Sequence, residues 1–463
     1  MRRLVLIAVL AALIVPVFTA SARAHTVRRA IIDPRLVDAS AADRDAYLDE
    51  IANDLHARSI RLDVIWSSAE PTQGVYNETY LAAVKAVADA ATTRGLSVIV
   101  TVIYTPKWAS NRSLWDTPPA GYDSGVYFPF YAMDMEKLPD FRSFATHLAT
   151  TLGPTVNRYE CWNEPNLWPY IYPQRTDGDK FFAARIYAKM LRSFSRGIGD
   201  GNADALIVGG ATAPIGGNHI YSTTPTRFAR FLKDAHAGRY FDIYSHHPYT
   251  PGGSLYMAPG APPNDTRTTV TLNNLKTLLK LFPGKPFYLT EYGYNSSPSN
   301  DFGGGGVSET AQATYLRRAY AFAGRYSQVK VLMWYLLKDS AKSGAYDSTG
   351  VYTGLRRLNG SRKPSWYYFV GGSHLSLNTP TNAASGKAFW INGAFTNSRL
   401  TDLSDVKIVV QRHYPGGDWT TVTSDITNAA GKFRVSVKQA RAAQWRVAFQ
   451  GVAMSPVKSV GSK

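Results

Sequence analysis

The sequence has one cysteine among its 463 residues, so the chain cannot close an internal disulfide. A chain without such a cross-link needs a hydrophobic core that is large enough to be stable unaided. Hydrophobic residues make up 45% of the sequence and charged residues 18%, a balance typical of folded protein rather than disorder. The cysteine, Cys161, lies in a short apolar segment, where we expect a small buried side chain.

Blocks of like charge and long apolar runs are also missing. Lysine and arginine are scattered although the formal net charge is +17, so the sequence gives nucleic-acid binding little support. Two explanations of the surplus of positive charge stay open: contact with anionic polymers or cell surfaces, and simple solubility. Beyond the N-terminus no apolar run has the length that a membrane-spanning helix needs.

Residues 1–24 have the pattern of a secretory signal peptide. Arg2 and Arg3 supply the positive end, and residues 4–18 form a short hydrophobic run. Residues 22–24 read Ala-Arg-Ala, a small-x-small cleavage site. We therefore predict a secreted, extracellular protein; a retained N-terminal anchor is the alternative.

Residues 25–372 alternate between short apolar segments and amphipathic segments, about eight times in all. The predicted strands include residues 27–33, 59–66, 96–103, 205–209, 241–247, 285–291 and 329–335, and the predicted helices include 42–58, 78–94, 140–151, 179–199, 225–237, 267–281, 308–325 and 363–370. Such alternation predicts an α/β fold, a (β/α)₈ TIM barrel. A doubly wound open sheet is the alternative, but the glycine-rich phosphate turn expected after its first strand is missing.

Residues 373–463 have a different texture. A Ser-, Asn-, Thr- and Pro-rich segment comes first, and short alternating runs separated by turn residues follow. This pattern predicts a linker and a small all-β, immunoglobulin-like sandwich. Between residues 377 and 463 there are eleven Lys or Arg against four Asp and no Glu, so contact with a glycan or cell wall is one role for this basic domain and structural packing is another.

Residues 158–168, Arg-Tyr-Glu-Cys-Trp-Asn-Glu-Pro-Asn-Leu-Trp, contain the first candidate for catalysis. The segment begins as a buried strand and must end before Pro165, which cannot donate to a sheet ladder. Asn163 and Glu164 therefore lie at the carboxyl end of the strand, where barrels of this type carry their catalytic groups. The alternative is an ordinary helix start, because Asn, Glu and Pro are all common there.

A second carboxylate, Glu291, ends the predicted strand at residues 285–291. On a closed barrel the carboxyl ends of the strands meet at one mouth, so Glu291 and Glu164 should converge. Glycoside hydrolysis uses such a pair, one acid to protonate the leaving oxygen and one carboxylate to attack the anomeric carbon. Two ordinary surface charges at strand ends are the alternative.

At Trp162-Asn-Glu-Pro-Asn166 and Thr290-Glu-Tyr-Gly293 the chain resembles the retaining glycoside hydrolases of clan A, especially family 5 cellulases and family 39 glycosidases. The resemblance covers about residues 27–370. It implies that Glu164 is the acid/base and Glu291 the nucleophile, with no metal and no organic cofactor. A retaining mechanism requires the two carboxyl groups to lie about 5 Å apart.

Four more residues match the clan pattern. Arg61 resembles the arginine that bonds the nucleophile, and His247-Pro-Tyr249 resembles a His-x-Tyr motif whose tyrosine bonds Glu291. Trp334 resembles the aromatic floor beneath the bound sugar, since sugar rings pack their C–H faces on aromatic planes. For Arg61 and Trp334 the alternatives are a buried ion-pair partner and a core side chain.

Three further side chains are predicted to bind substrate. Asn163 is suited to bond the sugar 2-hydroxyl, a contact that strengthens in the transition state. Trp108 and Trp168 lie in loops after predicted strands and could line sugar subsites, or simply pack within their loops.

The sequence predicts a secreted retaining β-glycosidase that hydrolyses O-glycosyl bonds of a polysaccharide, with endo action favoured by its long aromatic loops. The alternatives are an exo-acting β-glycosidase of family 39 type and a non-catalytic glycan-binding barrel. A metal-dependent hydrolase would need clustered ligands at strand ends. His246 and His247 are the close pair, but adjacent strand residues face opposite sides, so we expect no metal and a structural His246.

Overall fold

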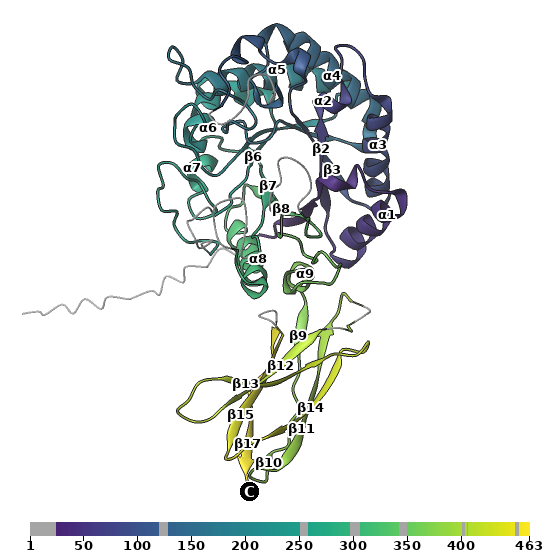
Figure 1. Cartoon of the computed structure of the whole chain (residues 1–463), viewed down its shortest axis with the longest axis vertical. Coiled ribbons are helices and arrows are strands. Elements are labelled where there is room, and N and C mark those ends of the chain that lie inside the picture. The colour runs from purple at the N-terminus through teal and green to yellow at the C-terminus, as the bar shows by residue number, and fades with distance from the viewer. Residues whose placement is uncertain are drawn as a thin grey trace, which may run out of the picture.

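The computed structural model describes residues 25–119, 128–250, 258–296, 306–341, 350–400, 403–404, 406–449 and 453–463. The predicted signal peptide, residues 1–24, lies outside these ranges. Figure 1 shows a round body of strands ringed by helices, followed by a smaller body built of strands alone.

Eight parallel strands close the barrel in sequence order, so the predicted TIM barrel is confirmed and the open doubly wound sheet is wrong. The ring closes where Ile31 of the first strand pairs with Trp334 of the last. The strands are β1 Arg28–Ile32, β2 Ser59–Ile65, β3 Ser97–Ile103, β4 Arg158–Cys161, β5 Leu206–Thr212, β6 Ile243–His246, β7 Phe287–Tyr292 and β8 Val329–Tyr335.

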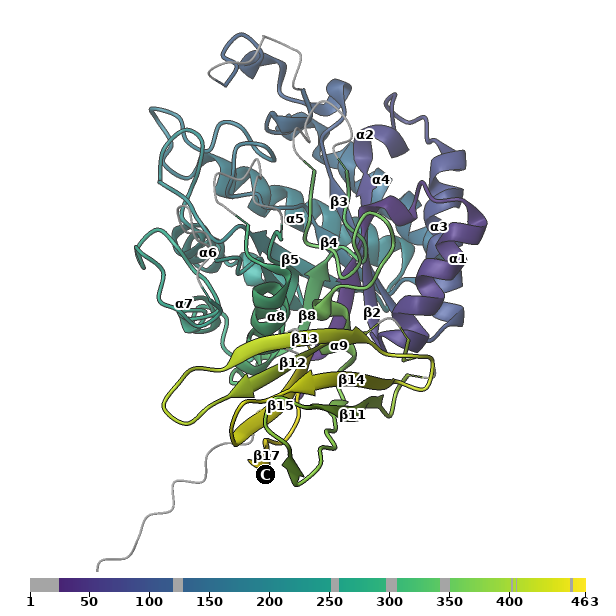
Figure 2. The same ribbon diagram turned by 60° about the horizontal axis from the view of Figure 1, so that its bottom comes forward.

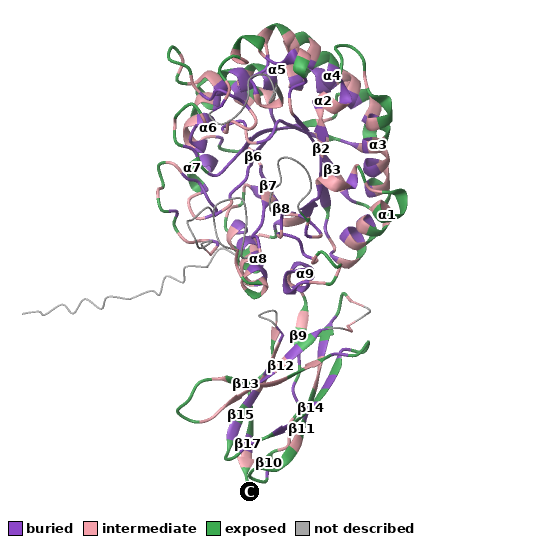
Figure 3. Cartoon of the chain, viewed as in Figure 1, coloured by how far each residue is buried: buried purple, intermediate pink, exposed green. Residues whose placement is uncertain are grey.

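Alternation along each strand divides the buried side chains into two cores. The small inner core fills the barrel, and the large outer core lies between strands and helices. On β8, Met333 belongs to the inner core while Trp334 belongs to the outer one. Figure 3 shows the barrel strands buried along most of their length. A polar side chain at the mouth is therefore anchored in rigid, closely packed surroundings.

Helices cover the outside of the barrel, as Figure 1 shows. Several begin with a side-chain cap: Asn77 accepts a hydrogen bond from the amide of Tyr80, and Ser308 from that of Ala311. The helices are α1 Ala41–Asp49, α2 Trp66–Ala69, α3 Glu78–Thr93, α4 Leu138–Leu152, α5 Phe182–Gly201, α6 Pro225–Asp234, α7 Lys276–Leu279, α8 Glu309–Ala323 and α9 Pro364–Val370.

The predicted helix at residues 267–281 is wrong, because only α7, four residues long, forms there. Side-chain bonds replace the helical ladder: the Asn274 carboxamide accepts from the amide of Thr271 and donates to the carbonyl of Thr269. The amide of Val270 donates to the carbonyl of Pro214 at 2.7 Å, so the segment is tied to the loop after β5. These contacts override the helical propensity of residues 267–281.

The C-terminal domain has two sheets, and the predicted β-sandwich is confirmed. On β14, Phe433, Val435 and Val437 are buried while the intervening side chains are exposed, the alternation expected of a sheet with one covered face. One sheet has β10 Asn382–Ala383, β17 Lys458–Ser462, β15 Ala443–Phe449, β12 Lys407–His413 and β13 Thr420–Ile426, with β16 Ala453–Met454 beside β15, and the other has β14 Lys432–Lys438, β11 Ala388–Asn397 and β9 Ser373–Leu375.

Helix α9 joins the two domains, and Figure 2 shows the sandwich strands crossing in front of it. The ring of Tyr367 meets Phe395 and Phe449 edge-on, with centroids 5.7 and 4.9 Å apart. Arg399 donates to the carbonyl of Val370 at 2.7 Å. In the part of the chain that the structure describes, no helix combines the length and apolarity needed to cross a membrane.

We expect Tyr367→Ala to reduce the free energy of unfolding by about 3 kcal/mol, because it empties an aromatic contact between the domains. Urea unfolding followed by tryptophan fluorescence measures this loss. Tyr367→Phe keeps the ring and is the control, with an expected loss of about 1 kcal/mol or less. Equal losses in the two variants would show that the ring contacts are not what stabilises this junction.

Candidate active site

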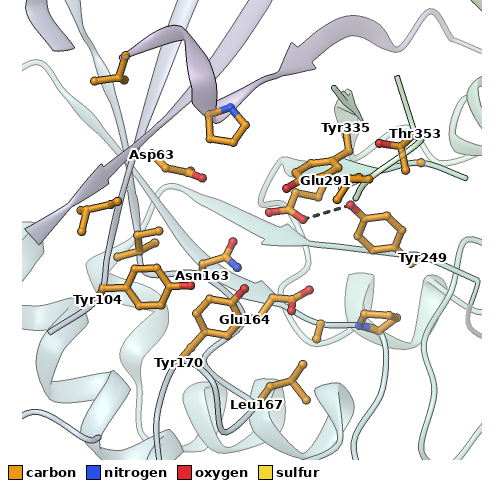
Figure 4. A pocket seen from close by; sticks show the side chains of 18 of the residues that line it. Asp63, Tyr104, Asn163, Glu164, Leu167, Tyr170, Tyr249, Glu291, Tyr335 and Thr353 are labelled. Carbon is orange, nitrogen blue, oxygen red and sulfur yellow. Dashed lines mark hydrogen bonds between the residues drawn. The ribbon is translucent and has the colours of Figure 1, made fainter. Parts of the chain in front are cut away.

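Glu164 and Glu291 meet at the mouth of the barrel, Glu164 just after β4 and Glu291 near the end of β7. One oxygen of each carboxyl group and one ring nitrogen of His247 all lie within 4.8 Å of one another. The Glu164 and Glu291 side chains are 15% and 14% exposed, so both reach the cavity from largely buried positions. Figure 4 shows the two carboxyl groups facing the same space.

The backbone around Glu164 adopts conformations that side-chain-bearing residues rarely take. Trp162 has φ 69° and Glu164 has φ 38°, both in the left-handed region. The amide of Glu164 donates to the carbonyl of Ala211 on β5 at 2.9 Å, which holds this turn. Strain of this kind costs roughly 1–3 kcal/mol per residue and gathers at functional sites.

Arg61 on β2 is fully buried and holds several of the site's polar groups at once. Its guanidinium donates to Glu291 Oε1, to Asn163 Oδ1 and to Thr101 Oγ1, each at 2.6 Å. It also forms an ion pair with Glu160 at 3.0 Å. The contact predicted between Arg61 and Glu291 is present, and so is the buried carboxylate partner that was its alternative.

The electrostatic surroundings keep Glu291 ionised. Burial by itself would raise the pKa of Glu291, but the positive charges of His247 and Arg61 and the hydrogen bonds from Arg61 and Tyr249 lower it below its ordinary value. Tyr249 donates its hydroxyl to Glu291 Oε2 at 3.2 Å, the contact that the sequence predicted. Both oxygens of Glu291 are thus held by donors.

The surroundings of Glu164 shift its pKa in the other direction, upwards. Burial raises the pKa of Glu164, and the nearby charge of Glu291 adds to this, while the hydrogen bond with His247 works against it. The two carboxyl groups therefore differ in the direction of their pKa shifts. Such a divergence marks an acid and a base at one site.

The protonation of His247 follows from its neighbours. Its Nε2 lies 3.1 Å from Thr290 Oγ1, and the single hydroxyl proton of Thr290 is donated to Glu160 at 2.9 Å. Nε2 must therefore be the donor, which leaves Nδ1, 3.0 Å from Glu164 Oε1, either to accept the proton of Glu164 or to carry it. One proton is thus shared between Glu164 and His247.

The carboxyl pair lines a cavity of about 940 Å³. Aromatic rings form much of its wall, and Tyr104 and Tyr170 stack with centroids 5.9 Å apart. Other lining residues come from the ends of strands and from the loops and helices that follow them; they include Pro34, Val37, Asp38, Asp63, Ser68, Tyr80, Leu167, Pro214, Gly293, Asn295, Tyr335 and Thr353. Figure 4 labels ten of the lining side chains, Asp63 and Tyr335 among them.

The structure brings together six of the predicted site residues. Glu164, Glu291, Asn163 and Tyr249 line the cavity. Arg61 and His247 lie behind them, both fully buried and bonded to the carboxyl groups, so they act on the carboxyl groups rather than on the open cavity. His246 faces away from the site: its ring nitrogens bond Thr212 Oγ1 and the carbonyl of Val270, and burial lowers its pKa to about 3.

Trp334 is not the floor of the cavity, and the prediction for it is corrected. Its side chain is fully buried in the outer core, with the indole N–H donating to the carbonyl of Thr353 at 2.8 Å. Strand alternation explains the error, because the inward-facing residues of β8 are Met333 and Tyr335. Tyr335 is the aromatic residue of β8 that lines the cavity.

Trp108 and Trp168 also lie elsewhere. Trp108 donates its indole N–H to the carbonyl of Glu70 at 3.0 Å and lines a separate hollow of about 510 Å³. Trp168 meets Phe130 and Tyr221 edge-on, with centroids 5.7 and 6.4 Å apart. Neither lines the cavity that holds the carboxyl pair, so the alternative of loop packing fits both better.

The sequence prediction missed Asp63, Tyr104 and Tyr335 as cavity-lining residues. For Asp63 a signal existed, because it follows Arg61 by two positions and therefore shares its face of β2. Tyr335 follows Met333 of the inner core in the same way. Tyr104, which follows β3, gave no comparable signal.

Glu164, His247 and Glu291 are also of the residue types that bind metal ions. Their donor atoms are already engaged, however: Glu291 accepts from Arg61 and Tyr249, and His247 bonds Glu164 and Thr290. A cation here would meet the buried guanidinium of Arg61 at close range. This donor set fits a proton-transfer pair better than a metal centre, and the prediction of no metal stays a prediction.

Comparison with known proteins places the barrel in a family. The model of the family described as cellulase (glycosyl hydrolase family 5) matches residues 37–339, well over half of the chain. No curated protein matches the sequence.

Solved structures share the fold at low sequence identity. A family 39 glycoside hydrolase from Bacteroides cellulosilyticus WH2 has a TM-score of 0.50 and 17% identity, over 89% of this chain and 80% of its own. GH5_18 from Streptomyces cattleya, solved with GlcNAc, gives 0.53 and 16%, over 75% and 80%. Exo-beta-1,4-mannosidase Op5Man5 from Opitutaceae bacterium strain TAV5 gives 0.50 and 17%, over 74% and 58%. At such identities the likeness is one of fold.

We expect Arg61→Met to reduce the free energy of unfolding by about 3–5 kcal/mol at pH 7.5, because it leaves buried carboxylates without their cation. This loss of unfolding free energy should be smaller at pH 4.5 than at pH 7.5. Without Arg61 the pKa values of these carboxyl groups rise in the folded state, so folding takes up protons and is favoured by acid. Urea unfolding at several pH values measures the difference.

Arg142→Met serves as the control for that experiment. Arg142 pairs with Asp200 at 2.7 Å on the surface, with side chains 46% and 43% exposed, so we expect a loss far smaller than that of Arg61→Met. A loss for Arg61→Met that is the same at acid and neutral pH would contradict the electrostatic explanation.

Proposed function

Because the chain belongs to the cellulase family, glycosyl hydrolase family 5, we propose that it hydrolyses β-glycosidic bonds by double displacement. The observation that carries the proposal is the spacing of Glu164 and Glu291, whose nearest oxygens lie within 4.8 Å. Retaining glycosidases hold their carboxyl groups about 5–5.5 Å apart, whereas inverting enzymes leave about 6.5–9.5 Å for a water molecule. The opposite pKa shifts of the two groups support the same assignment.

In the first step Glu291 attacks the anomeric carbon while Glu164 gives its proton to the departing glycosidic oxygen. Glu291 is suited to attack because its pKa is lowered and its position is fixed by Arg61 and Tyr249. Glu164 is suited to protonate the leaving group because burial raises its pKa and so favours its acid form. The products of this step are the free leaving group and a sugar bound through an ester to Glu291.

In the second step Glu164, now ionised, takes a proton from water, and the resulting hydroxide attacks the anomeric carbon. The ester bond to Glu291 breaks, and Glu164 ends the cycle protonated. His247 assists both steps, since its Nδ1 lies 3.0 Å from Glu164 and can hold the shared proton. Two inversions at one carbon give overall retention.

Asn163 is the residue that we assign to the sugar 2-hydroxyl. Its Oδ1 accepts from Arg61 at 2.6 Å, which fixes the carboxamide and leaves Nδ2 as the donor for substrate. Asn163 lines the cavity between the two carboxyl groups and Asp63 (Figure 4). A hydrogen bond at this position strengthens in the transition state and lowers the barrier to both steps.

We propose a β-linked polysaccharide or oligosaccharide as substrate. The cavity volume of about 940 Å³ is near the upper end for ligand sites and supports a chain of sugars over a single ring. On this basis we propose endo action, and exo action is the second candidate, supported by the fold shared with an exo-beta-1,4-mannosidase. From the pattern of residues 1–24 we propose that the enzyme is secreted, and from the charge of residues 373–463 that this domain contacts glycan or cell-wall surfaces.

We expect Glu291→Ala to lower kcat on aryl β-glycosides by about 10⁴-fold or more, because no nucleophile remains. Added azide should restore turnover and yield an α-linked glycosyl azide, since azide would attack from the space that the carboxylate had filled. Nuclear magnetic resonance of the product identifies the anomer. The control is Glu78→Ala, a 64% exposed carboxylate on α3, which should keep wild-type kinetics. A β-linked glycosyl azide would show instead that Glu291 is the acid/base and Glu164 the nucleophile.

We expect the pH dependence of kcat/KM in the wild-type enzyme to be bell-shaped. Activity should fall at low pH as Glu291, with its lowered pKa, becomes protonated, and fall at higher pH as Glu164, with its raised pKa, loses its proton. In Glu164→Gln the alkaline limb should disappear. The variant should lose about 10²–10⁴-fold on 4-nitrophenyl glycosides and far less on 2,4-dinitrophenyl glycosides, which leave without protonation.

Kinetics on both leaving groups across pH 4–9 test this, with initial rates as the measurement. An alkaline limb that persists in Glu164→Gln would assign the acid to another residue. A wild-type enzyme that binds β-glucans but cleaves none of them, nor any aryl β-glycoside, would favour the non-catalytic glycan-binding alternative.

A further inference from the structure

Asp63 lies beside the carboxyl pair but takes no part in the two steps derived above. It follows Arg61 by two positions on β2, and its side chain lines the cavity. Figure 4 shows its carboxyl group directed towards the space between Asn163 and Glu291. The side chain is 17% exposed, so it faces the cavity from a position that is mostly buried.

Neither oxygen of Asp63 accepts a hydrogen bond from any residue that the structure describes. Its nearest cation is Arg61, whose Nη2 lies 3.4 Å from Oδ1 but donates to Asn163 Oδ1 at 2.6 Å instead. Oδ1 is buried and unsatisfied. A buried acceptor without a donor is unfavourable, so the group is expected to have a partner when the site is filled.

Other buried carboxylates of the barrel do have their donors. Glu160 accepts from the hydroxyls of Thr101 and Thr290, at 2.8 and 2.9 Å. Asp33 at the end of β1 is held by the guanidinium of Arg35 through both oxygens. Asp63 is thus an exception among these groups, and its unsatisfied oxygen is located at the cavity.

The position of Asp63 relative to the reaction is fixed by Arg61. One guanidinium contacts Glu291, which attacks the anomeric carbon, Asn163, which we assign to the 2-hydroxyl, and Asp63. The three groups therefore surround one sugar ring, the one that becomes bonded to Glu291. With carbons 1 and 2 accounted for, the hydroxyl groups left on the near edge of that ring are those at carbons 3 and 4.

We propose that Asp63 is a specificity-determining residue that binds the 3- and 4-hydroxyl groups of the sugar bonded to Glu291. The inference rests on the proposed function in its exo-acting form and adds a substrate class to it: a chain-terminal sugar with both hydroxyls free and placed for a carboxylate. Vicinal hydroxyls donate two hydrogen bonds to the two oxygens of one carboxylate.

The titration of Asp63 is compatible with this role. Burial raises its pKa to about 6, with Arg61 lowering it and Glu291 and Glu160 raising it further. Above that pH the carboxylate accepts two hydrogen bonds, and below it the acid accepts one and donates one. Hydroxyl groups can serve either state, since each is both donor and acceptor.

The test compares deoxy substrates within each enzyme variant. The parent is whichever of the 4-nitrophenyl β-glucoside, β-mannoside and β-xyloside the wild-type enzyme cleaves with the highest kcat/KM. Its 2-, 3- and 4-deoxy forms are then measured on wild type, Asp63→Ala and Asp63→Asn. We expect wild type to disfavour the 3- or 4-deoxy form by about 10²-fold or more.

In Asp63→Ala that preference should fall below about 5-fold, while the preference against the 2-deoxy form stays at its wild-type value because Asn163 is intact. Asp63→Asn, which keeps one acceptor, should lie between. Each preference is a ratio within one protein, so a variant that folds in reduced yield still gives a valid result. Asp134→Asn, on the wall of the separate hollow beside Trp108, is the matched control and should keep every wild-type ratio.

Two results would overturn the inference about Asp63 alone. The first is a uniform loss of activity in Asp63→Ala with the 3- and 4-deoxy ratios unchanged, because Asp63 would then act only through Arg61. The second is a wild-type enzyme that cleaves the parent but does not distinguish the 3- and 4-deoxy forms, or one that cleaves a β-linked polysaccharide but none of the three parents. A wild-type enzyme inert towards all three parents and towards β-linked polysaccharides would instead overturn the proposed function, and this inference with it.

Discussion

A single buried cation, the guanidinium of Arg61, is the constraint on which the mouth of this barrel depends. It reaches from β2 to Thr101 on β3, to Glu160 and Asn163 at β4 and to Glu291 on β7. A cation in such a place is tolerable only because carboxylates surround it, and those carboxylates are tolerable only because of it. The site is therefore one electrostatic unit, and its geometry is set before any substrate arrives.

This arrangement explains how two glutamates with the same chemistry differ. Glu291 has the guanidinium, the Tyr249 hydroxyl and the imidazole of His247 close by, while Glu164 has the imidazole and the cavity wall. Thr290, whose hydroxyl proton is donated to Glu160, settles which nitrogen of His247 carries a proton, and so it acts on Glu164 across two hydrogen bonds. The two glutamates have identical side chains, so the difference between their pKa values comes from their surroundings.

Much of this could be predicted from the sequence, because the physical signals were local or periodic. The barrel followed from alternation of strands and helices, and the convergence of Glu164 and Glu291 followed from their places at strand ends. The Trp334 assignment failed where the period of two was not applied, and the same rule would have found Asp63 and Tyr335.

Other features could not be predicted in this way. The segment before α7 takes its shape from the carbonyl of Pro214 and the ring of His246, which are distant in sequence. Trp108 and Trp168 belong to loops, whose packing partners no periodic pattern reveals. Side-chain positions are thus predicted best in regular strands and helices, and worst in loops.

The left-handed residues at the mouth have a consequence for how this scaffold can change. Tyr104 follows β3, Trp162 and Glu164 follow β4, and Leu336 follows β8, each with positive φ, while the ring itself is closed by β1 and β8 in regular register. The regularly paired strands thus stabilise the barrel wall, whereas the strained residues at its rim cost free energy. Loop residues around the cavity can then diverge, altering which sugars fit, without putting the closure of the barrel at risk.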